Sequence, residues 1–310
     1  MAESGRAALG LVGIGKIARD QHVPAISAGS DFTLTATASP NSAIDGVPAF
    51  PDLAAMLAGA PSITAVSLST PAAVRYDLAV QAIEAGRHVM LEKPPAATLS
   101  QASDLADRAR EKGVTLFATW HVREGAAVEQ ARQWLAVRRI DAVRIFWKED
   151  IRHWHPGQEW LLGPGGFGVF DPGINALSVL TAILPHPVVL DTATMEVPEG
   201  RVSPLRATLT MRSGTTPVSA EFDFLQTGPQ RWDIEVDTDA GPLALADGGA
   251  TLTIGDAAAE RAPDHEYARL YARFAELIAR GESDVDLTPL QLVADAFLVA
   301  DRTTGERFTF

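Results

Sequence analysis

Near the N-terminus the chain reads Leu9-Gly-Leu-Val-Gly13-Ile-Gly15-Lys-Ile-Ala18, an apolar segment followed by a glycine turn. This spacing is typical of a strand that turns sharply into a helix and holds a pyrophosphate against the backbone of the turn. Ala18 replaces the last glycine of the usual Gly-x-Gly-x-x-Gly pattern and is still small enough for close helix packing. The segment therefore predicts a dinucleotide-binding turn.

The first 120 residues alternate between short apolar strands and helices. We expect strands at residues 8–12, 33–38, 63–69, 88–91 and 115–118, and helices at 17–28, 51–58, 72–85 and 99–112. This order is typical of a parallel, doubly wound sheet with helices on both faces. The sequence thus predicts an α/β Rossmann domain over residues 1–121.

From residue 141 onwards, apolar and polar residues alternate with a period of two. Such runs occupy residues 141–148, 188–197, 205–212, 218–225 and 232–238. A period of two indicates an antiparallel sheet with one covered face. We expect an α+β domain over residues 122–310, built on a large, mainly antiparallel open sheet, with helices at 173–184, 265–280 and 290–301. The last two helices are expected at the edge of the sheet or at the domain junction.

Composition limits the possible functions. The net charge of −13 argues against nucleic acid and anionic membranes as partners, and the 46% hydrophobic content of the 310 residues is enough for two cores. No cysteine is present, which excludes disulfides and thiolate metal sites. There is no apolar run of about 18 residues and no signal-peptide pattern, so we expect a cytoplasmic protein with a small neutral ligand or a cofactor.

Glu92-Lys93-Pro94 follows the predicted strand at residues 88–91. Ligands of doubly wound sheets bind beyond the carboxyl ends of strands, which is where this tripeptide is expected. A lysine held there near a bound nicotinamide could orient a substrate hydroxyl or help to remove its proton. The alternative is an ordinary solvated lysine, since most lysines are exposed. Together with the glycine turn, the tripeptide favours hydride transfer.

The end of the second predicted strand bears on the choice between NAD and NADP. An acidic residue there commonly binds the ribose of NAD, whereas an arginine nearby accommodates the 2′-phosphate of NADP. Ser39-Pro40-Asn41 offers neither group. The cofactor is therefore predicted to be NAD or NADP, with the preference open.

A second polar group lies in the C-terminal half. Asp171 and Asn175 are four residues apart in a predicted helical segment, which places both on one helix face. Asp171 could equally be the N-cap of that helix, with Pro172 at its first position. Both interpretations can hold at once.

Histidine and tryptophan cluster before that helix. His153 and His155 match no strong metal-ligand spacing, so we expect no metal site. Trp154 lies between them, and aromatic residues near polar side chains commonly line sugar sites. Its alternative role is that of a core or lid residue.

These motifs occur together in one known family. The glycine turn, Glu92-Lys93-Pro94, the antiparallel domain and Asp171-Pro-Gly-Ile-Asn175 resemble the glucose-fructose oxidoreductase / inositol dehydrogenase / MocA (Gfo/Idh/MocA) family over nearly the whole chain. More narrowly, longer segments resemble the bacterial L-arabinose and D-galactose 1-dehydrogenases of that family; they are residues 12–22, 88–95, 117–121, 147–150, 154–157 and 168–178.

The resemblance implies NAD(P)-dependent oxidation of a monosaccharide such as L-arabinose, D-galactose or D-fucose at C1 to its lactone. It also implies a second-domain sheet that often pairs subunits. By position, the residues that would form the sugar site are Lys93, Glu149, His155, Asp171 and Asn175, with Trp154 and His121 beside them. Those that would contact the dinucleotide are Gly13, Gly15, Lys16, Ile17, Ser39, Pro40, Asn41, Thr70, Glu92 and Lys93.

Two departures from the family pattern matter. Many members carry histidine where Asn175 stands, and an amide cannot accept a proton at neutral pH, so Asp171 assisted by Lys93 is the expected proton acceptor. Pro40 stands where NADP-using relatives of this branch carry arginine, which weakens the case for NADP. Alternative functions are oxidation of another polyol, such as an inositol, and a non-catalytic nucleotide-binding sensor.

Overall fold

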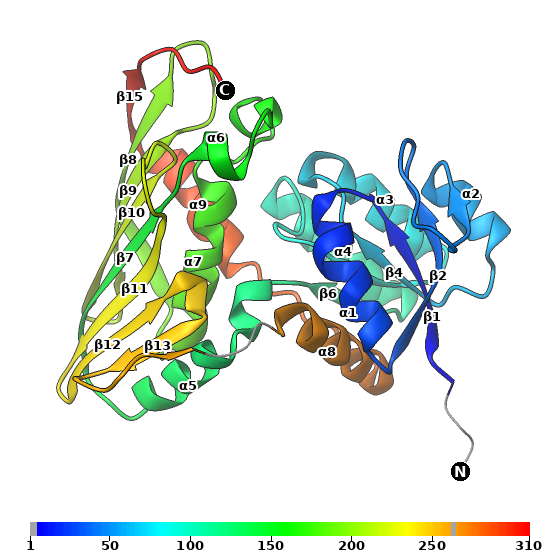
Figure 1. Ribbon diagram of the computed structural model, residues 1–310, viewed down its shortest axis with the longest axis horizontal. Coiled ribbons are helices and arrows are strands. Elements are labelled where there is room, and N and C mark those ends of the chain that lie inside the picture. The colour runs from blue at the N-terminus through cyan, green and yellow to red at the C-terminus, as the bar shows by residue number, and fades with distance from the viewer. Residues whose placement is uncertain (1–4, 262–264) are drawn as a thin grey trace. The chain divides into compact units, whose positions relative to one another are not determined.

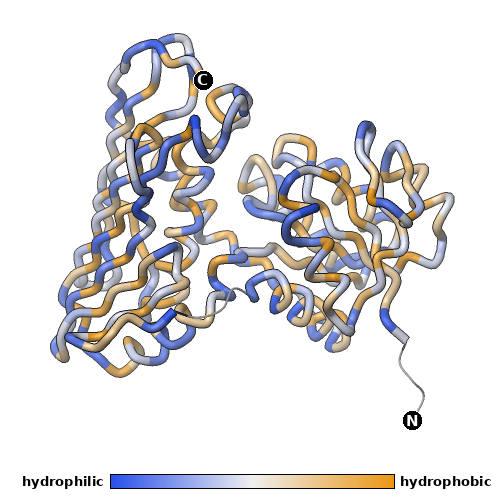
Figure 2. The backbone as a smooth tube through the Cα atoms, in the orientation of Figure 1, coloured by the Kyte–Doolittle hydropathy of each residue, from blue (hydrophilic) through white to orange (hydrophobic). Residues whose placement is uncertain are grey.

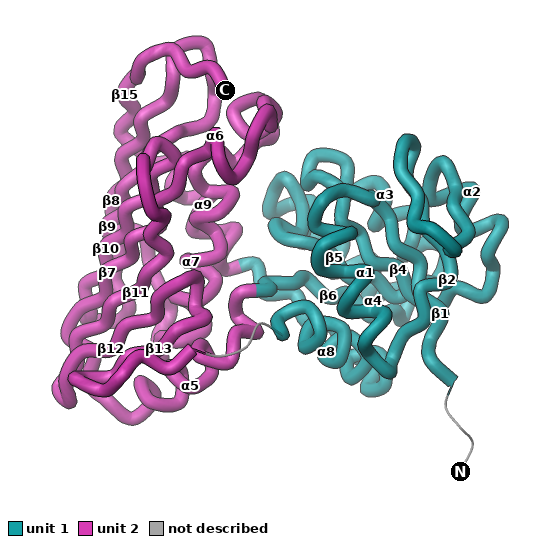
Figure 3. The backbone as a smooth tube through the Cα atoms, viewed as in Figure 1, with its two compact units in different colours: residues 1–121, 265–287 teal, residues 122–264, 288–310 magenta. Residues whose placement is uncertain are grey.

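The computed structural model describes residues 5–261 and 265–310, and the chain divides into two compact units (Figure 3). Unit 1 contains residues 1–121 and 265–287, and unit 2 contains residues 122–264 and 288–310. Each unit is built around a sheet of its own. The chain therefore passes from unit 2 back to unit 1 for residues 265–287 and then returns to unit 2 for its last residues.

Unit 1 is built on a parallel sheet with the strand order β3-β2-β1-β4-β5-β6. Every neighbouring pair of these strands runs parallel, which confirms the predicted doubly wound sheet. The strand order reverses between β1 and β4, and ligands of such sheets bind at this switch point. The strands are β1 Ala7–Val12, β2 Phe32–Ala38, β3 Ala49–Phe50, β4 Ala65–Leu68, β5 His88–Leu91 and β6 Leu116–Ala118.

Helices cover both faces of this sheet (Figure 1). On one face α2 (Leu53–Gly59), α3 (Ala72–Glu84) and α4 (Leu99–Lys112) pack against buried strand residues such as Val66 and Val89. On the other face lie α1 (Val23–Ala28), preceded by a π-helical turn at Ala18–His22, and α8 (Glu266–Arg280).

The position of α8 differs from one of the two alternatives expected for residues 265–280, the edge of the sheet. The helix buries an apolar stripe from Tyr267 to Leu277 against Leu9, Ala65 and Met90 of the central strands. It therefore covers a face of the parallel sheet rather than an edge, because its apolar side fits the strand face that α1 leaves uncovered.

Unit 2 is built on a larger sheet with the order β14-β13-β12-β11-β7-β10-β9-β8-β15. The pairs β7–β10 and β8–β15 are parallel and the other neighbours are antiparallel, so the prediction of a mainly antiparallel sheet is confirmed. The strands are β7 Ile140–Lys148, β8 Val188–Pro198, β9 Arg206–Ser213, β10 Thr216–Asp223, β11 Arg231–Thr238, β12 Gly241–Ala246, β13 Thr251–Ile254, β14 Glu260–Arg261 and β15 Asp301–Gly305.

One face of the larger sheet carries α5 (Ala126–Leu135), α7 (Phe170–Ile183) and α9 (Thr288–Val299), and hydrophobic and hydrophilic residues alternate along its strands (Figures 1 and 2). In β9, for example, every second residue is buried beneath the helices and the others are exposed. Shorter helical turns are α6 Ile151–Trp154 and the 3₁₀ turns His121–Glu124, Glu159–Leu162 and Asp247–Gly249.

Two helices of unit 2 have different ends from those expected. α7 begins at Phe170, three residues earlier than predicted, because Pro172 falls in its first turn, where the missing N–H costs no hydrogen bond. α9 ends at Val299, and Asp301, which was expected in the helix, begins β15 beside β8.

Over residues 5–261 and 265–310, no helix is both long enough and apolar enough to cross a membrane.

Candidate active site

The glycine turn after β1 packs directly on the loop after β4. Gly13 has a φ of 86°, and a Cβ at this position would lie 2.8 Å from Thr70 Cγ2 and 2.9 Å from Thr70 N. Ser69 Oγ donates to the carbonyl oxygen of Gly13 over 2.7 Å. Both the left-handed backbone and the close approach therefore require glycine at residue 13.

Among the described residues, no neighbour requires glycine at residue 15. A Cβ there would meet nothing within 4 Å, and its backbone is exposed. Nearby, the buried Thr70 Oγ1 has no hydrogen-bond partner in the part of the chain that the structure describes. An exposed glycine backbone and an unsatisfied hydroxyl, both just after the strands that flank the switch point, fit a bound dinucleotide, whose pyrophosphate needs close approach to the backbone.

The other predicted dinucleotide contacts lie at the surface around this turn. Lys16 is 87% exposed and pairs with Asp20, and Ile17 is 37% exposed. At the end of β2, Ser39 N donates to Phe50 O over 3.0 Å, and Pro40 and Asn41 are exposed. These three residues bring neither an acid nor an arginine to the strand end, so the structure adds no preference between NAD and NADP.

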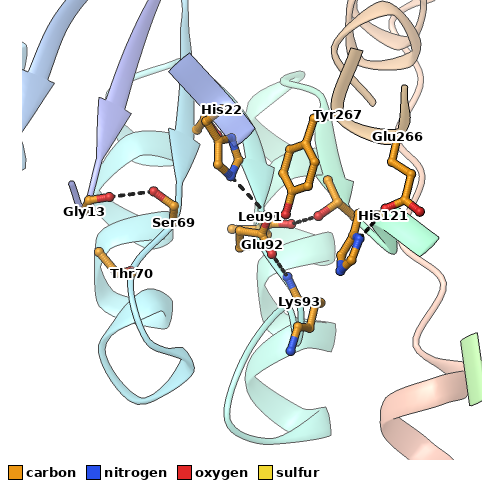
Figure 4. A network of polar contacts seen from close by, with 12 residues as sticks. Gly13, His22, Ser69, Thr70, Leu91, Glu92, Lys93, His121, Glu266 and Tyr267 are labelled. Atoms are coloured by element: carbon orange, nitrogen blue, oxygen red, sulfur yellow. Dashed lines mark hydrogen bonds and ion pairs between the residues drawn. The ribbon is translucent and has the colours of Figure 1, made fainter. Parts of the chain in front are cut away.

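Glu92 follows β5 and is the centre of a buried polar network (Figure 4). Its Oε1 accepts from Tyr267 OH over 2.7 Å and lies 3.1 Å from His22 Nε2. Its Oε2 accepts from the backbone N–H of Lys93 over 2.9 Å. Both carboxylate oxygens are thus used to fix the chain immediately before Pro94, with which Lys93 forms a cis peptide bond. Lys93 itself is half-buried, unlike an ordinary solvated lysine.

The network favours an ionised Glu92. Burial alone would raise its pKa, but the hydrogen bond from His22, the nearby His121 and the hydroxyl of Tyr267 outweigh burial, and the pKa lies below its usual range. Burial and the adjacent Glu92 carboxylate raise the pKa of Tyr267 well above 10, so its hydroxyl stays protonated and donates.

His121 follows β6 and contacts the first turn of α8. Its Nδ1 lies 2.6 Å from Glu266 Oε2, and its ring stacks on that of Tyr267 with 5.5 Å between the ring centroids. Unit 1 therefore brings together Glu92, Lys93 and His121 at the ends of neighbouring strands (Figure 4).

In unit 2, Glu149 follows β7 and is 3% exposed. Its Oε1 lies 3.0 Å from His155 Nε2, and its Oε2 accepts from Trp232 Nε1 over 2.8 Å. Trp154 is 40% exposed, and its ring centroid lies 4.9 Å from that of Trp232. The structure thus brings Glu149, His155 and Trp154 together, as the predicted sugar site requires. Over the described ranges, no three His, Asp or Glu side chains form a group that could hold a metal ion.

Asp171 and Asn175 lie in the first two turns of α7. The N-cap of this helix is Val169, so the interpretation of Asp171 as the N-cap is wrong. Asp171 N donates to Gly168 O over 2.9 Å, and both Asp171 and Asn175 are half-buried. The buried Asn175 Oδ1 has no hydrogen-bond partner among the residues that the structure describes. It is a polar acceptor on a helix that is otherwise largely apolar.

Comparison with known proteins assigns the chain to a family. Residues 8–120 match the family model described as "Oxidoreductase family, NAD-binding Rossmann fold", the Gfo/Idh/MocA oxidoreductases. Over 301 residues the chain is 43% identical to galactose 1-dehydrogenase from Pseudomonas fluorescens, a match that covers 97% of this chain and 98% of the relative. The chain belongs to the Gfo/Idh/MocA oxidoreductase family. The predicted family, enzyme class and NAD-binding Rossmann domain are thereby confirmed.

Solved structures agree with this assignment. The fold of this Gfo/Idh/MocA oxidoreductase matches the crystal structure of D-galactose 1-dehydrogenase from Rhizobium etli with a TM-score of 0.96 and 49% identity, over 100% of both chains. A 3-ketoreductase from Actinomadura kijaniata, solved with NADP, shares the fold with a TM-score of 0.80 at 19% identity, covering 98% of this chain and 100% of that one.

Several residues that hold the candidate site of this Gfo/Idh/MocA oxidoreductase belong to none of the motifs recognised in the sequence. Buried Arg75, on α3, donates to the carbonyl oxygens of Thr70, Glu92 and Pro94, which ties the loops after β4 and β5 together. His22 and Tyr267 hold Glu92, and Trp232 holds Glu149. Little in the sequence could reveal them, because Tyr267 and Glu92 are 175 positions apart. An arginine within an apolar helix was the clearest signal available.

Proposed function

We propose that this oxidoreductase is an aldose 1-dehydrogenase that oxidises D-galactose at C1 to the lactone, with NAD or NADP. The observation that carries the proposal is the 43% identity to galactose 1-dehydrogenase along almost the entire chain. The match to the Rhizobium etli D-galactose 1-dehydrogenase structure supports it. L-Arabinose and D-fucose share the configuration of D-galactose at C2, C3 and C4, so a site that binds these hydroxyls is expected to accept all three sugars.

In this proposal, Glu149, His155 and Asn175 bind sugar hydroxyls. Glu149 keeps free lone pairs after accepting from Trp232, and its burial strengthens a hydrogen bond to a hydroxyl. Asn175 Oδ1 is an acceptor to which the described part of the chain offers no donor, so a substrate hydroxyl would satisfy it. Trp154, exposed beside Trp232, and His121 complete the proposed sugar contacts.

Asp171 is proposed as the acceptor of the proton from the C1 hydroxyl, and Lys93 as the residue that orients this hydroxyl and assists its ionisation. An amide at residue 175 cannot take the proton, so the base must be another side chain. The nicotinamide cofactor, when bound, supplies the acceptor for the hydride that leaves C1. Loss of one proton from oxygen and one hydride from carbon converts the C1 hydroxyl into the lactone carbonyl.

The cofactor is proposed to lie on the turn after β1 and the strand ends around it. Gly13 and Gly15 would face the pyrophosphate, and Thr70 and Glu92 would line the side of β4 and β5. The remaining proposed contacts are Lys16, Ile17, Ser39, Pro40, Asn41 and Lys93. Because Pro40 supplies no guanidinium for a 2′-phosphate, we expect NAD to be used at least as well as NADP.

We also propose a cytoplasmic homodimer that pairs through the exposed face of the unit 2 sheet. Ionic side chains on this face are matched within the sheet, for example Arg144 with Asp237 and Lys148 with Glu221. A second copy could cover such a face without leaving buried charges unpaired.

Initial rates of nicotinamide reduction test the function. We expect turnover with D-galactose, L-arabinose and D-fucose but not with D-glucose or myo-inositol, each assayed with NAD and with NADP. Asp171→Asn and Lys93→Ala are expected to lower kcat at least about 100-fold, and Asp171→Asn is expected to keep nucleotide binding. Asp256→Asn, at an exposed position of the same unit, is the matched control.

Three results would contradict these assignments. Turnover with myo-inositol alone would indicate a polyol dehydrogenase. Nucleotide binding without turnover of any sugar would indicate a sensor. Near-normal turnover by Asp171→Asn would move the role of proton acceptor to another residue.

A further inference from the structure

The first turn of α8 contacts residues at the ends of β5 and β6, close to Lys93 and His121. Tyr267 OH donates to Glu92 Oε1 over 2.7 Å, and the ring of Tyr267 is stacked on His121. The neighbouring Glu266 lies 2.6 Å from His121 Nδ1. A helix far along the chain therefore contacts two residues of the proposed site.

His22 holds Glu92 from a different element, the π-helical turn that follows the glycine turn. Its Nε2 lies 3.1 Å from Glu92 Oε1, and its Nδ1 lies 2.7 Å from Tyr271 OH. The side chain is 1% exposed. Because Glu92 and Tyr271 use both ring nitrogens, the imidazole has a single orientation, with its Nε2 directed at the carboxylate.

We propose that Tyr267 and His22 are positioning residues for Lys93, which hold the Glu92 carboxylate so that it in turn holds the Lys93 backbone. The predicted effect on kcat rests on the proposed function, whereas the predicted effect on the Lys93 backbone does not. It names residues that are not expected to touch sugar or nucleotide.

The backbone of Lys93 depends on Glu92 for a specific reason. Pro94 and Pro95 have no amide hydrogen, so Lys93 supplies the only backbone donor in residues 93–95. That donor is bound by Glu92 Oε2, while Oε1 is bound by Tyr267 and His22. Loss of one partner of Oε1 frees the carboxylate to rotate, which lengthens or breaks the bond to Lys93. A shift of about 1 Å in a catalytic group can lower the rate about 100-fold.

A purely structural role predicts something different. Removing a buried hydroxyl would then lower stability without a specific change at Lys93. Tyr76 provides the matched comparison, because its hydroxyl also donates to a carboxylate over 2.7 Å, that of Asp104, within the same unit. Tyr76→Phe and Tyr267→Phe remove the same chemical group from two sites, and only the second contacts Glu92.

The test combines a spectroscopic with a kinetic measurement. The chain has only four lysines, so ¹⁵N-lysine labelling gives four backbone amide signals, and Lys93→Arg assigns the one of interest; the residues are Lys16, Lys93, Lys112 and Lys148. In Tyr267→Phe we expect the Lys93 signal to shift and its hydrogen exchange to accelerate at least about fivefold. The other lysine signals in Tyr267→Phe, and the Lys93 signal in Tyr76→Phe, are expected to stay unchanged.

Kinetics then test the consequence for the reaction. We expect Tyr267→Phe to lower kcat about tenfold while the nucleotide Kd stays within about twofold of the original. At His22, glutamine places its amide nitrogen where Nε2 stood and asparagine does not, so His22→Gln is expected to keep more activity than His22→Asn. If Tyr267→Phe does not fold, the Lys93 amide signal and kcat of His22→Gln and His22→Asn test the proposal in its place.

Each failure has a separate meaning. An unchanged Lys93 amide in Tyr267→Phe would overturn the positioning role, whatever the substrate. A changed amide with unchanged kcat would overturn its relevance to catalysis. If the original protein turned over no sugar, the proposed function would fail, and the amide measurement would still decide whether Tyr267 holds Lys93.

Discussion

At the scale of single residues, the two glycines of the first turn have different physical reasons to be glycine. Gly13 has a φ of 86° and no room for a Cβ, because Thr70 lies 2.8 Å from where it would stand. Gly15 has open space around the same position. The protein's own packing therefore explains residue 13, whereas residue 15 is proposed to be glycine because the dinucleotide approaches it.

This difference predicts that alanine lowers mainly stability at residue 13 and mainly nucleotide affinity at residue 15. Gly13→Ala is expected to lower the free energy of unfolding by about 1–3 kcal/mol, because it combines a left-handed backbone with a steric clash. Gly15→Ala is expected to change the free energy of unfolding by less than about 1 kcal/mol but to weaken NAD binding at least about tenfold. Urea unfolding and nucleotide titration measure both. Unchanged NAD affinity in a folded Gly15→Ala protein would remove residue 15 from the proposed cofactor site.

Glu92 predicts a pH dependence of stability. Its pKa is lower in the folded protein than the usual 4.5, because the donors to its carboxylate outweigh the effect of burial. The folded state therefore binds fewer protons than the unfolded chain below about pH 4.5, and the stability from Glu92 is complete above that pH and lost as the pH falls further.

The measurement compares unfolding of the original protein with Glu92→Gln. We expect the original to be more stable by about 1–3 kcal/mol near pH 7, with the difference shrinking below about pH 4.5. Glu111→Gln, at an exposed carboxylate of the same unit, controls for the loss of a charge. A difference that is constant down to about pH 3 would show that the folded-state pKa of Glu92 is not lowered.

At the scale of elements, local pattern predicted most strands and helices, whereas partners remote in sequence decided the rest. The alternating apolar residues of β9 and the apolar stripe of α8 are visible in a short window of sequence. β15, with the sequence Asp301-Arg-Thr-Thr-Gly305, has no apolar alternation and is a strand because it pairs with β8. A similar limit applies to the two-residue β14, Glu260–Arg261, which pairs with β13. β12 and β13 do alternate, with Leu243, Leu245 and Leu252 buried, but they are short and were not among the predicted strands.

The candidate site shows the same division. Glu92, Lys93, Asp171 and Asn175 were found because their motifs are continuous in the sequence. The contacts of Glu92 with Tyr267 could not be found this way, because they depend on the return of α8 to the face of the parallel sheet. The residues proposed to touch ligands were therefore more visible in the sequence than those that hold them in place.

At the scale of the whole molecule, a large negative net charge coexists with one sheet face on which basic and acidic side chains are paired. The chain carries a net charge of −13, so two copies repel each other at long range. On the exposed face of the unit 2 sheet, however, basic side chains are paired with acids; the pairs are Arg144–Asp237, Lys148–Glu221, Arg206–Asp223 and Arg231–Glu235. This face is the part of the sheet best suited to approach a second copy.

We therefore expect a dimer whose stability increases with salt, because salt screens the net repulsion while the paired charges on the face are already matched. Light scattering after size-exclusion chromatography should give twice the chain mass of 32.9 kDa at micromolar concentration.

Thr210→Glu places a charge on the exposed side of β9, where no basic partner is in register, since Thr210 pairs with Ser219 and Thr192. It is expected to shift the protein towards monomer, whereas Thr33→Glu, at an exposed position of β2, is not. A monomer at all salt concentrations, or equal effects of the two substitutions, would mean that this face does not pair subunits.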